Sequence, residues 1–281
     1  MAPATAKLAD CDLAPGPARS GWRPVLQFGL STFLIGLVLS VAIRPWLALS
    51  WWQVFRRCAS IAAALSVGLL LRQERRSLSS YGFSDFRAGK RQLLFGLLLG
   101  VSALGVMLAL GLLTGVFRMQ ITDDTARLWR ALIGFLPAAF LVSILEELVF
   151  RGVILQHLLG SSKLVAVLTS SSLYAVVHLK TVSTALGMGF ELVGLFLLGC
   201  VLALSYLLTG QLYLSVGLHA SLAYGAQVNK LCVQFLDHAP SWLVGTSRIV
   251  NGLAGWVALL GIAGIIIWQT RGSRTGERQH G

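Results

Sequence analysis

The sequence predicts an all-α, polytopic integral membrane protein: a helical bundle with about eight transmembrane helices. Three observations predict this fold class. Hydrophobic residues occupy 56% of the 281 positions, the mean hydropathy is +0.75, and only 12% of the residues are charged. That charged share is about half of what a soluble domain carries. The composition therefore excludes an ordinary soluble protein and a disordered one.

Eight apolar runs interrupt the polar segments, and each is predicted to be a helix that crosses the bilayer. About 20 apolar residues, rising 1.5 Å each, are needed to cross the hydrocarbon core. The fourth, fifth and seventh runs differ from the others because they hold ionisable side chains in their interior. In chain order the predicted spans are residues 25–43, 51–71, 93–117, 131–159, 164–179, 190–208, 212–228 and 249–268.

The predicted domain organisation is one membrane domain between two polar tails. Residues 1–24 form the amino-terminal tail, residues 25–268 the transmembrane domain, and residues 269–281 the carboxyl-terminal tail. The first tail is not predicted to be a signal peptide, because it contains Lys7, Asp10 and Asp12 and lacks a continuous apolar core. No separate soluble domain is expected.

The net charge of +12 is interpreted as interfacial charge. Basic residues lie in short segments between apolar runs, where they meet anionic headgroups and fix topology. The predicted partners are therefore the lipid bilayer and a membrane-associated substrate, and not a nucleic acid. The segments on the side of the two termini hold 13 Lys and Arg residues, against 9 on the other side. This bias predicts that both termini are cytoplasmic, in a protein of the plasma (inner) membrane.

The fourth run contains two adjacent carboxylates in an otherwise apolar helix, Glu146 and Glu147. Such groups are costly inside a membrane and usually functional. Glu147 and Arg151 are four residues apart, so they are predicted to form a buried supporting ion pair on one helix face. Glu146 points about 100° away from that face. It is predicted to face a polar cavity and to act as the general base on a water molecule.

The fifth and seventh runs each supply a histidine. Tyr174 and His178 are four residues apart and share a helix face, and His219 lies in the short seventh run. Glu146, His178 and His219 are the predicted catalytic set. They could bind a divalent metal such as zinc with one position open. They could equally hold the water directly, with one histidine as acid–base partner and the other donating to an oxyanion.

The remaining ionisable residues near the spans are predicted to have ordinary roles. His157, close to the end of the fourth run, and Glu191, close to the start of the sixth, are interpreted as interfacial or solvated residues. The pair Asp123-Asp124 is predicted to cap the start of a helix.

Taken in order, Glu146-Glu147-x-x-x-Arg151, Tyr174-x-x-x-His178 and His219 resemble the motifs of the CPBP family. This group comprises CAAX prenyl endopeptidases and bacteriocin-processing (Abi) intramembrane proteases. The resemblance covers residues 130–225. It implies that Glu146 activates water with His178 as its partner. It also implies that His219 stabilises the oxyanion or ligates a metal, while Glu147, Arg151 and Tyr174 support the site.

Two positions depart from the family pattern. Ala223 stands four residues after His219, where active members often carry Asn or Asp, so the site is expected to lack one donor or supporting group. Ser215 or Gln227 could take its place. Tyr174 replaces the commoner Phe.

The leading functional prediction is an intramembrane endopeptidase that hydrolyses a peptide bond in a membrane-associated or lipidated (CAAX-type) peptide or protein. The alternative is a catalytically inactive family member that serves as a membrane scaffold or bacteriocin-immunity protein, which Ala223 favours. A proton-coupled transporter ranks third. Transporters also bury carboxylates and histidines, but no repeated or interrupted spans are found here.

Overall fold

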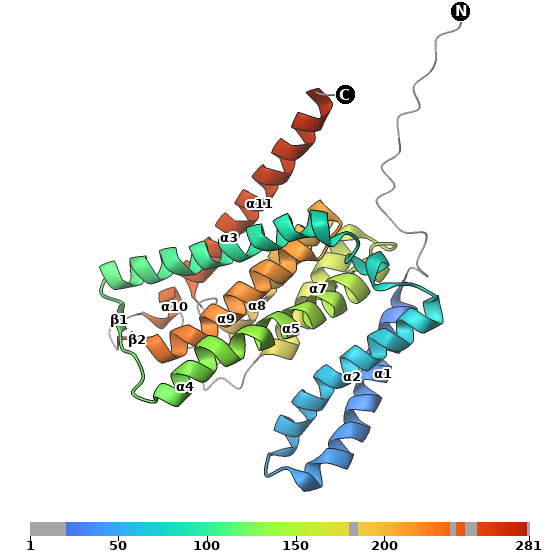
Figure 1. The fold of residues 1–281 in the computed structure, drawn as a ribbon, viewed down its shortest axis with the longest axis horizontal. Helices are drawn as coiled ribbons and strands as arrows, with labels where there is room; N and C mark the ends of the chain where they lie inside the picture. The colour runs from blue at the N-terminus through green and yellow to red at the C-terminus, as the bar shows by residue number, and fades with distance from the viewer. Residues whose placement is uncertain (1–20, 180–184, 237–239, 245–251, 280–281) are drawn as a thin grey trace, which may run out of the picture.

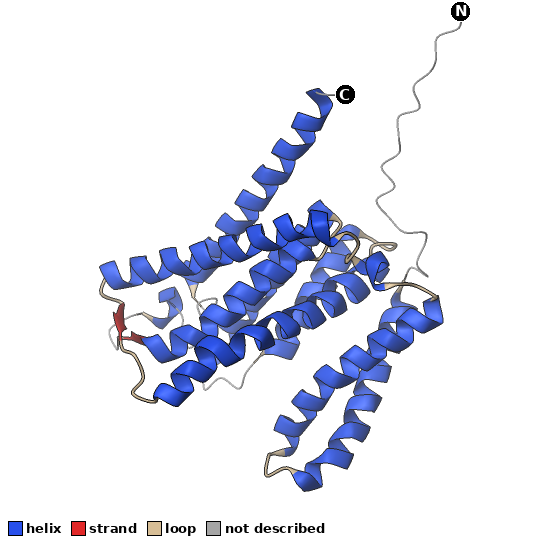
Figure 2. Ribbon diagram, viewed as in Figure 1, coloured by secondary structure: helices blue, strands red, loops and turns tan. Residues whose placement is uncertain are grey.

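A computed structural model of the protein describes residues 21–179, 185–236, 240–244 and 252–279, and Figures 1 and 2 show that these are almost entirely helical. The all-α prediction is confirmed. The α-helices are α1 (Trp22–Ile43), α2 (Trp51–Glu74), α3 (Phe86–Leu113), α4 (Thr125–Trp129), α5 (Phe135–Glu147), α6 (Gln156–Leu158), α7 (Lys163–His178), α8 (Ala185–Thr209), α9 (Tyr213–Cys232), α10 (Ser241–Val244) and α11 (Leu253–Gln279). Short 3₁₀ turns η1 (Arg44–Trp46) and η2 (Leu78–Tyr81), π-helical segments η3 (Arg130–Gly134) and η4 (Leu148–Leu155), and strands β1 (Phe117–Met119) and β2 (Val233–Phe235) complete the elements.

Within the described part of the chain, six helical stretches are long and apolar enough to cross a membrane. Their outer faces carry large exposed apolar side chains, such as Leu26 and Leu141, which suit contact with lipid tails. The protein is therefore an integral membrane protein. α7 is a shorter apolar helix, and α9 carries polar residues towards its end. The six stretches are residues 22–46, 51–74, 89–113, 125–158, 187–209 and 253–271.

The predicted spans lie where helices are found, but several ends differ. The third span, predicted to run to residue 117, ends at Leu113, because Gly115 adopts a positive φ of 69° and turns the chain. Phe117 lies instead in β1, which pairs antiparallel with β2. α11 continues to Gln279 through most of the segment predicted as a polar tail. Residues 1–20 of the other tail lie outside the described residues.

Local sequence signals explain where several helices begin. Ser50 forms a capping box with Gln53 at the start of α2. The side chain of Asp85 accepts a hydrogen bond from the first turn of α3. The predicted cap at Asp123-Asp124 is confirmed in part, because Asp124 accepts from the backbone N–H of Arg127 at 2.8 Å and begins α4.

The segments that join α2 to α3 and α8 to α9 meet at one end of the bundle, and β1 pairs with β2 at the other end (Figure 1). At one end the backbone N–H of Gly21 donates to the carbonyl of His157, and that of Leu212 donates to the carbonyl of Gly82. At the other end β1 pairs with β2, and the N–H of Leu236 donates to the carbonyl of Val116. The chain thus alternates between two ends, as successive membrane crossings require.

α3 and α9 pack with their backbones in close approach. A Cβ atom on Gly96 would lie 2.3 Å from the carbonyl oxygen of Leu214, and one on Gly217 would lie 2.2 Å from that of Leu93. Small residues allow this approach between membrane helices. On α3, Gly96 and Gly100 are four residues apart, which is the small-xxx-small spacing. This packing fixes the helix that carries His219 against the rest of the bundle.

Candidate active site

The structure brings the three predicted catalytic residues together from three helices. Glu146 lies near the end of α5, His178 at the end of α7, and His219 in the first half of α9. The Oε2 atom of Glu146 lies 3.0 Å from Nε2 of His178 and 3.5 Å from Nε2 of His219. In the sequence, His178 lies 32 positions after Glu146, and His219 lies 73 positions after it. They become neighbours because α9 packs against α5, while α7 packs against α8 and against the segment η4 that continues α5.

The predicted ion pair between Glu147 and Arg151 is present. Nη1 of Arg151 donates to Oε1 of Glu147 at 2.8 Å, and both side chains are fully buried. Nη2 of Arg151 also donates to the carbonyl oxygen of Gly199 on α8, at 3.0 Å. A buried charge needs such partners to offset its desolvation. The pair therefore joins the site-bearing helix to α8.

Glu147 has a second partner that the sequence pattern did not reveal. Its Oε1 lies 2.8 Å from Nδ1 of His219. This oxygen already accepts a hydrogen bond from Arg151, so we assign it as the acceptor here too, with Nδ1 of His219 carrying the hydrogen and donating it. His219 is thereby oriented with its Nε2 towards Glu146. Glu147 and His219 are 72 residues apart, and no local spacing could have linked them.

His178 is also oriented by a hydrogen bond. Its Nδ1 lies 2.8 Å from the carbonyl oxygen of Tyr174, and since a carbonyl only accepts, Nδ1 is the donor. Nε2 of His178 is then the ring atom that can gain or lose a proton, and it faces Glu146. The ring stacks on that of Tyr174, with centroids 4.2 Å apart.

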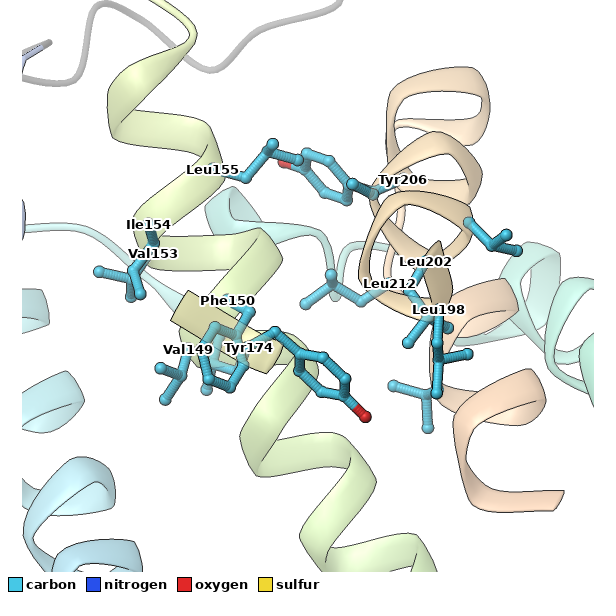
Figure 3. Close-up of a cluster of buried hydrophobic side chains, with 14 of the residues drawn as sticks. Val149, Phe150, Val153, Ile154, Leu155, Tyr174, Leu198, Leu202, Tyr206 and Leu212 are labelled. Atoms are coloured by element: carbon cyan, nitrogen blue, oxygen red, sulfur yellow. The ribbon is translucent and has the colours of Figure 1, made fainter. Parts of the chain in front are cut away.

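Tyr174 lies at the centre of the site. Its side chain is buried, and its ring contacts Phe150 and His219 edge-on. Figure 3 shows the ring beside Phe150 with the hydroxyl oxygen directed away from it. That hydroxyl lies 3.3 Å from Nε2 of His219. The guanidinium of Arg151 lies 4.9 Å from the centroid of the ring.

The backbone that follows the two glutamates is π-helical rather than α-helical. The segment η4 begins at Leu148, directly after Glu147, and all eight of its residues are buried. π-helical turns within longer helices are frequent at functional sites. Here the segment carries Arg151 together with Val149 and Phe150, which lie beside Tyr174 in Figure 3. The sequence predicted an uninterrupted helix over 131–159.

A cavity of about 330 Å³ opens beside Glu146. None of the described residues gives Glu146 Oε2 a hydrogen bond of acceptable geometry, although His178 Nε2 lies close. A buried carboxylate oxygen in this state is suited to hold a water molecule. The polar side chains that line the cavity are Arg56, Glu146, Tyr174, His178, His219, Gln227 and Lys230.

Glu146, His178 and His219 are the residues that would hold the predicted divalent metal. Zinc takes three or four ligand atoms within about 2.0–2.3 Å of the ion. Among the described residues, no group of three His, Cys, Asp or Glu side chains stands out as such a set. Oε2 of Glu146 lies 3.0 Å from Nε2 of His178. Zinc stays a prediction, which adding and removing a chelator during an activity assay would test.

Ser215 and Gln227, the two residues predicted to replace a donor at position 223, differ in whether they line the cavity. Ala223 and Gln227 both line the cavity. Ser215, by contrast, donates its hydroxyl to the carbonyl of Leu212 at 2.9 Å, within its own helix. Gln227 accepts a hydrogen bond from Lys230 at 3.4 Å. It lies eight residues past His219, about 12 Å along the helix axis.

The prediction that His157 is interfacial or solvated was wrong. Its side chain is fully buried, with Nδ1 2.7 Å from the carbonyl of Val153 and Nε2 2.9 Å from Oε1 of Glu74. The hydroxyl of Tyr81 donates to the other oxygen of Glu74 at 2.7 Å. Burial and the neighbouring Glu74 carboxylate raise the pKa of Tyr81, so it stays a donor. This cluster attaches α2 to the core.

Glu191 was also predicted to be interfacial or solvated, and it is buried. α8, which carries it, packs against both α7 and α11. Both errors have one cause. A polar residue near the end of an apolar run looks interfacial when the neighbouring helices are unknown.

Residues 127–224 match a family model described as type II CAAX prenyl endopeptidase, Rce1-like. This segment is an Rce1-like domain of the CPBP family. The matched residues contain Glu146, Glu147, Arg151, Tyr174, His178 and His219, so the CPBP resemblance is confirmed. A search of curated proteins and a search of solved structures found no match. The match supports a CAAX-type protease family for this segment.

Proposed function

We propose that this protein is an intramembrane endopeptidase that hydrolyses a peptide bond of a membrane-associated or lipidated, CAAX-type peptide or protein. The observation that carries the proposal is a half-buried carboxylate, Glu146, within 3.5 Å of two histidines and beside a cavity walled by membrane-spanning helices. An ionisable group inside a membrane domain is costly, and the residues that bear such groups are usually functional.

In the proposed reaction Glu146 accepts a proton from a water molecule held in the cavity, and the water oxygen attacks the scissile carbonyl carbon. Negative charge then develops on the carbonyl oxygen, where His219 donates from Nε2 when that atom carries a proton. The C–N bond breaks as the leaving nitrogen takes up a proton through His178 and Glu146. The products are a carboxylic acid and an amine, so no other reactant is consumed.

The nature of the substrate is supported by a second, apolar cavity. It has a volume of about 520 Å³ and lies between α3 and α11. Ala103, Met107, Ala258 and Ile262 line both this cavity and the one at Glu146. A lipid chain attached to a peptide could occupy the apolar cavity while the peptide reaches Glu146. We assign the substrate to lipidated or membrane-anchored peptides on this ground.

The first test compares host membranes that contain the wild-type protein or Glu146→Gln at matched protein level, by profiling the terminal peptides of all membrane proteins. We expect new termini with the wild type that are absent with the variant. In purified protein the substitution should lower kcat by at least about 10²-fold, since general base catalysis supplies that factor. Arg57→Ala, an exposed change on α2, is the matched control.

Identical termini in both samples, with the variant folded and a cellular phenotype intact, would contradict the protease assignment. That outcome would favour the catalytically inactive scaffold or immunity protein, for which Ala223 in the cavity wall is the specific observation. Proton-dependent flux in liposomes that contain only this protein would instead favour a transporter.

A further inference from the structure

The hydroxyl of Tyr174 is the polar group of the site that the reaction above leaves unused. It belongs to a buried side chain, and Tyr174 lines the same cavity as Glu146. The ring is held by contacts on several sides: stacking on His178, edge-on contacts with Phe150 and His219, and the guanidinium of Arg151. The position of the hydroxyl is therefore fixed by packing before any substrate binds.

The protonation of His219 determines what this hydroxyl can do. Glu147 holds the hydrogen of His219 on Nδ1. Neutral His219 thus presents a lone pair at Nε2, and the Tyr174 hydroxyl, 3.3 Å away, donates to it. In that state Nε2 has no hydrogen to give to an oxyanion. The donor at this point of the cavity is then the phenol itself.

Other side chains are poorly placed to supply a second donor. Ala223, one turn beyond His219, has no polar atom. Ser215 is engaged within its own helix, and Gln227 lies about 12 Å further along α9. The Nδ1 hydrogen of His178 is held by the carbonyl of Tyr174. Among these side chains of α7 and α9, the Tyr174 hydroxyl is the donor that lies 3.3 Å from Nε2 of His219.

We infer that Tyr174 is a catalytic residue whose hydroxyl donates a hydrogen bond to the oxyanion that forms on the scissile carbonyl, in the role that Ala223 cannot fill. The inference rests on the proposed peptidase function. When the carbonyl oxygen gains charge, the hydroxyl hydrogen turns from Nε2 of His219 to that oxygen. No bond to the phenol breaks, and the proton stays on Tyr174.

The test is Tyr174→Phe in the full-length purified protein, assayed on a peptide identified by comparing wild-type and Glu146→Gln membranes. The change removes one oxygen and keeps the ring and its stacking. We expect kcat to fall by about 10²–10³, as for loss of one oxyanion donor, with KM nearly unchanged and an unaltered melting temperature. Tyr206→Phe is the matched control, because this buried tyrosine accepts from Gln156 and lies outside the cavity lining.

A second variant separates a catalytic role from a structural one. Ala223→Asn places an amide donor one helical turn after His219, in the cavity wall. In the Tyr174→Phe background we expect it to restore kcat at least about tenfold, which repair of packing would not do. Tyr174→Phe with wild-type kcat, while Glu146→Gln is inactive, would overturn the inference and leave the peptidase proposal standing. Equal termini in wild-type and Glu146→Gln membranes would overturn both.

Discussion

At the scale of single residues, the two adjacent glutamates have different surroundings although they share a helix. Glu147 is enclosed: its Oε1 accepts from Arg151 and from His219. Glu146 faces the cavity, with one oxygen close to two histidines. The 100° between consecutive helical residues produces this division. One carboxylate becomes part of the scaffold and the other is available for chemistry.

The buried ion pair gives a stability prediction. Arg151→Ala leaves the Glu147 carboxylate buried without its main cation, so we expect a loss of about 3–5 kcal/mol in the free energy of unfolding. The readouts are protein level in membranes and melting temperature in detergent. The exposed change Arg57→Ala should stay within about 0.5 kcal/mol of the wild type.

The double variant Glu147→Gln with Arg151→Met tests the reason for that loss. It removes both charges, so no unpaired charge remains buried, and we expect it to be more stable than Arg151→Ala alone. A melting temperature of Arg151→Ala equal to that of the wild type would show that the pair does not support the fold.

At the scale of elements, the position of His219 depends on how closely α9 can approach α3. Gly96 and Gly217 are the points of contact, and each faces backbone atoms of the other helix. Backbone atoms cannot move aside as the end of a flexible side chain can. The small-xxx-small spacing of Gly96 and Gly100 is a sequence signal for such packing. It marks α3 as a helix that packs closely, although it does not name α9 as the partner.

Gly96→Ala is therefore predicted to separate α3 from α9. We expect a loss of about 1–3 kcal/mol in stability, together with reduced activity, because His219 moves with α9. Gly105→Ala on the same helix is the matched control, since a Cβ there meets no atom within 4 Å. Melting temperature and peptidase rate of the two variants should be compared side by side. Equal values for both would contradict the close packing.

At the scale of the whole molecule, alternation of the helices places the start of α1 and the end of α11 at the same end as the 72–92 loop. Hydrogen bonds join Gly21 to His157 and Leu212 to Gly82 at that end. β1 and β2 pair at the opposite end. The sequence segments predicted on the side of the 72–92 loop hold 13 Lys and Arg residues, against 9 in those predicted on the other side. Positive charge favours the cytoplasmic side.

We therefore expect that end to be cytoplasmic. Reporter domains fused after Ser79 and at the carboxyl terminus should report a cytoplasmic location, and one fused after Leu49 should report the other side. The pair of internal fusions controls for expression of the reporter on each side. A fusion after Ser79 that reports the outer side would reverse the orientation.

Composition and residue spacing were enough to predict the fold class, the approximate positions of the membrane helices and a set of candidate site residues. Apolar runs of spanning length leave a helix as the conformation that satisfies the backbone in lipid. Ionisable residues inside such runs are costly enough to stand out. The i,i+4 spacing of Glu147 and Arg151 was sufficient to predict their ion pair, because that contact lies within one helix.

Only the tertiary structure decided which residues meet across helices. The link from Glu147 to His219, the Tyr174 hydroxyl beside His219 Nε2, and the burial of His157 against Glu74 all join segments far apart in the chain. Helical periodicity specifies which face of a helix a residue occupies, but not which neighbour packs against that face. Which helices become neighbours depends on how closely they can pack. Gly96 and Gly217, for example, allow the backbones of α3 and α9 to approach each other.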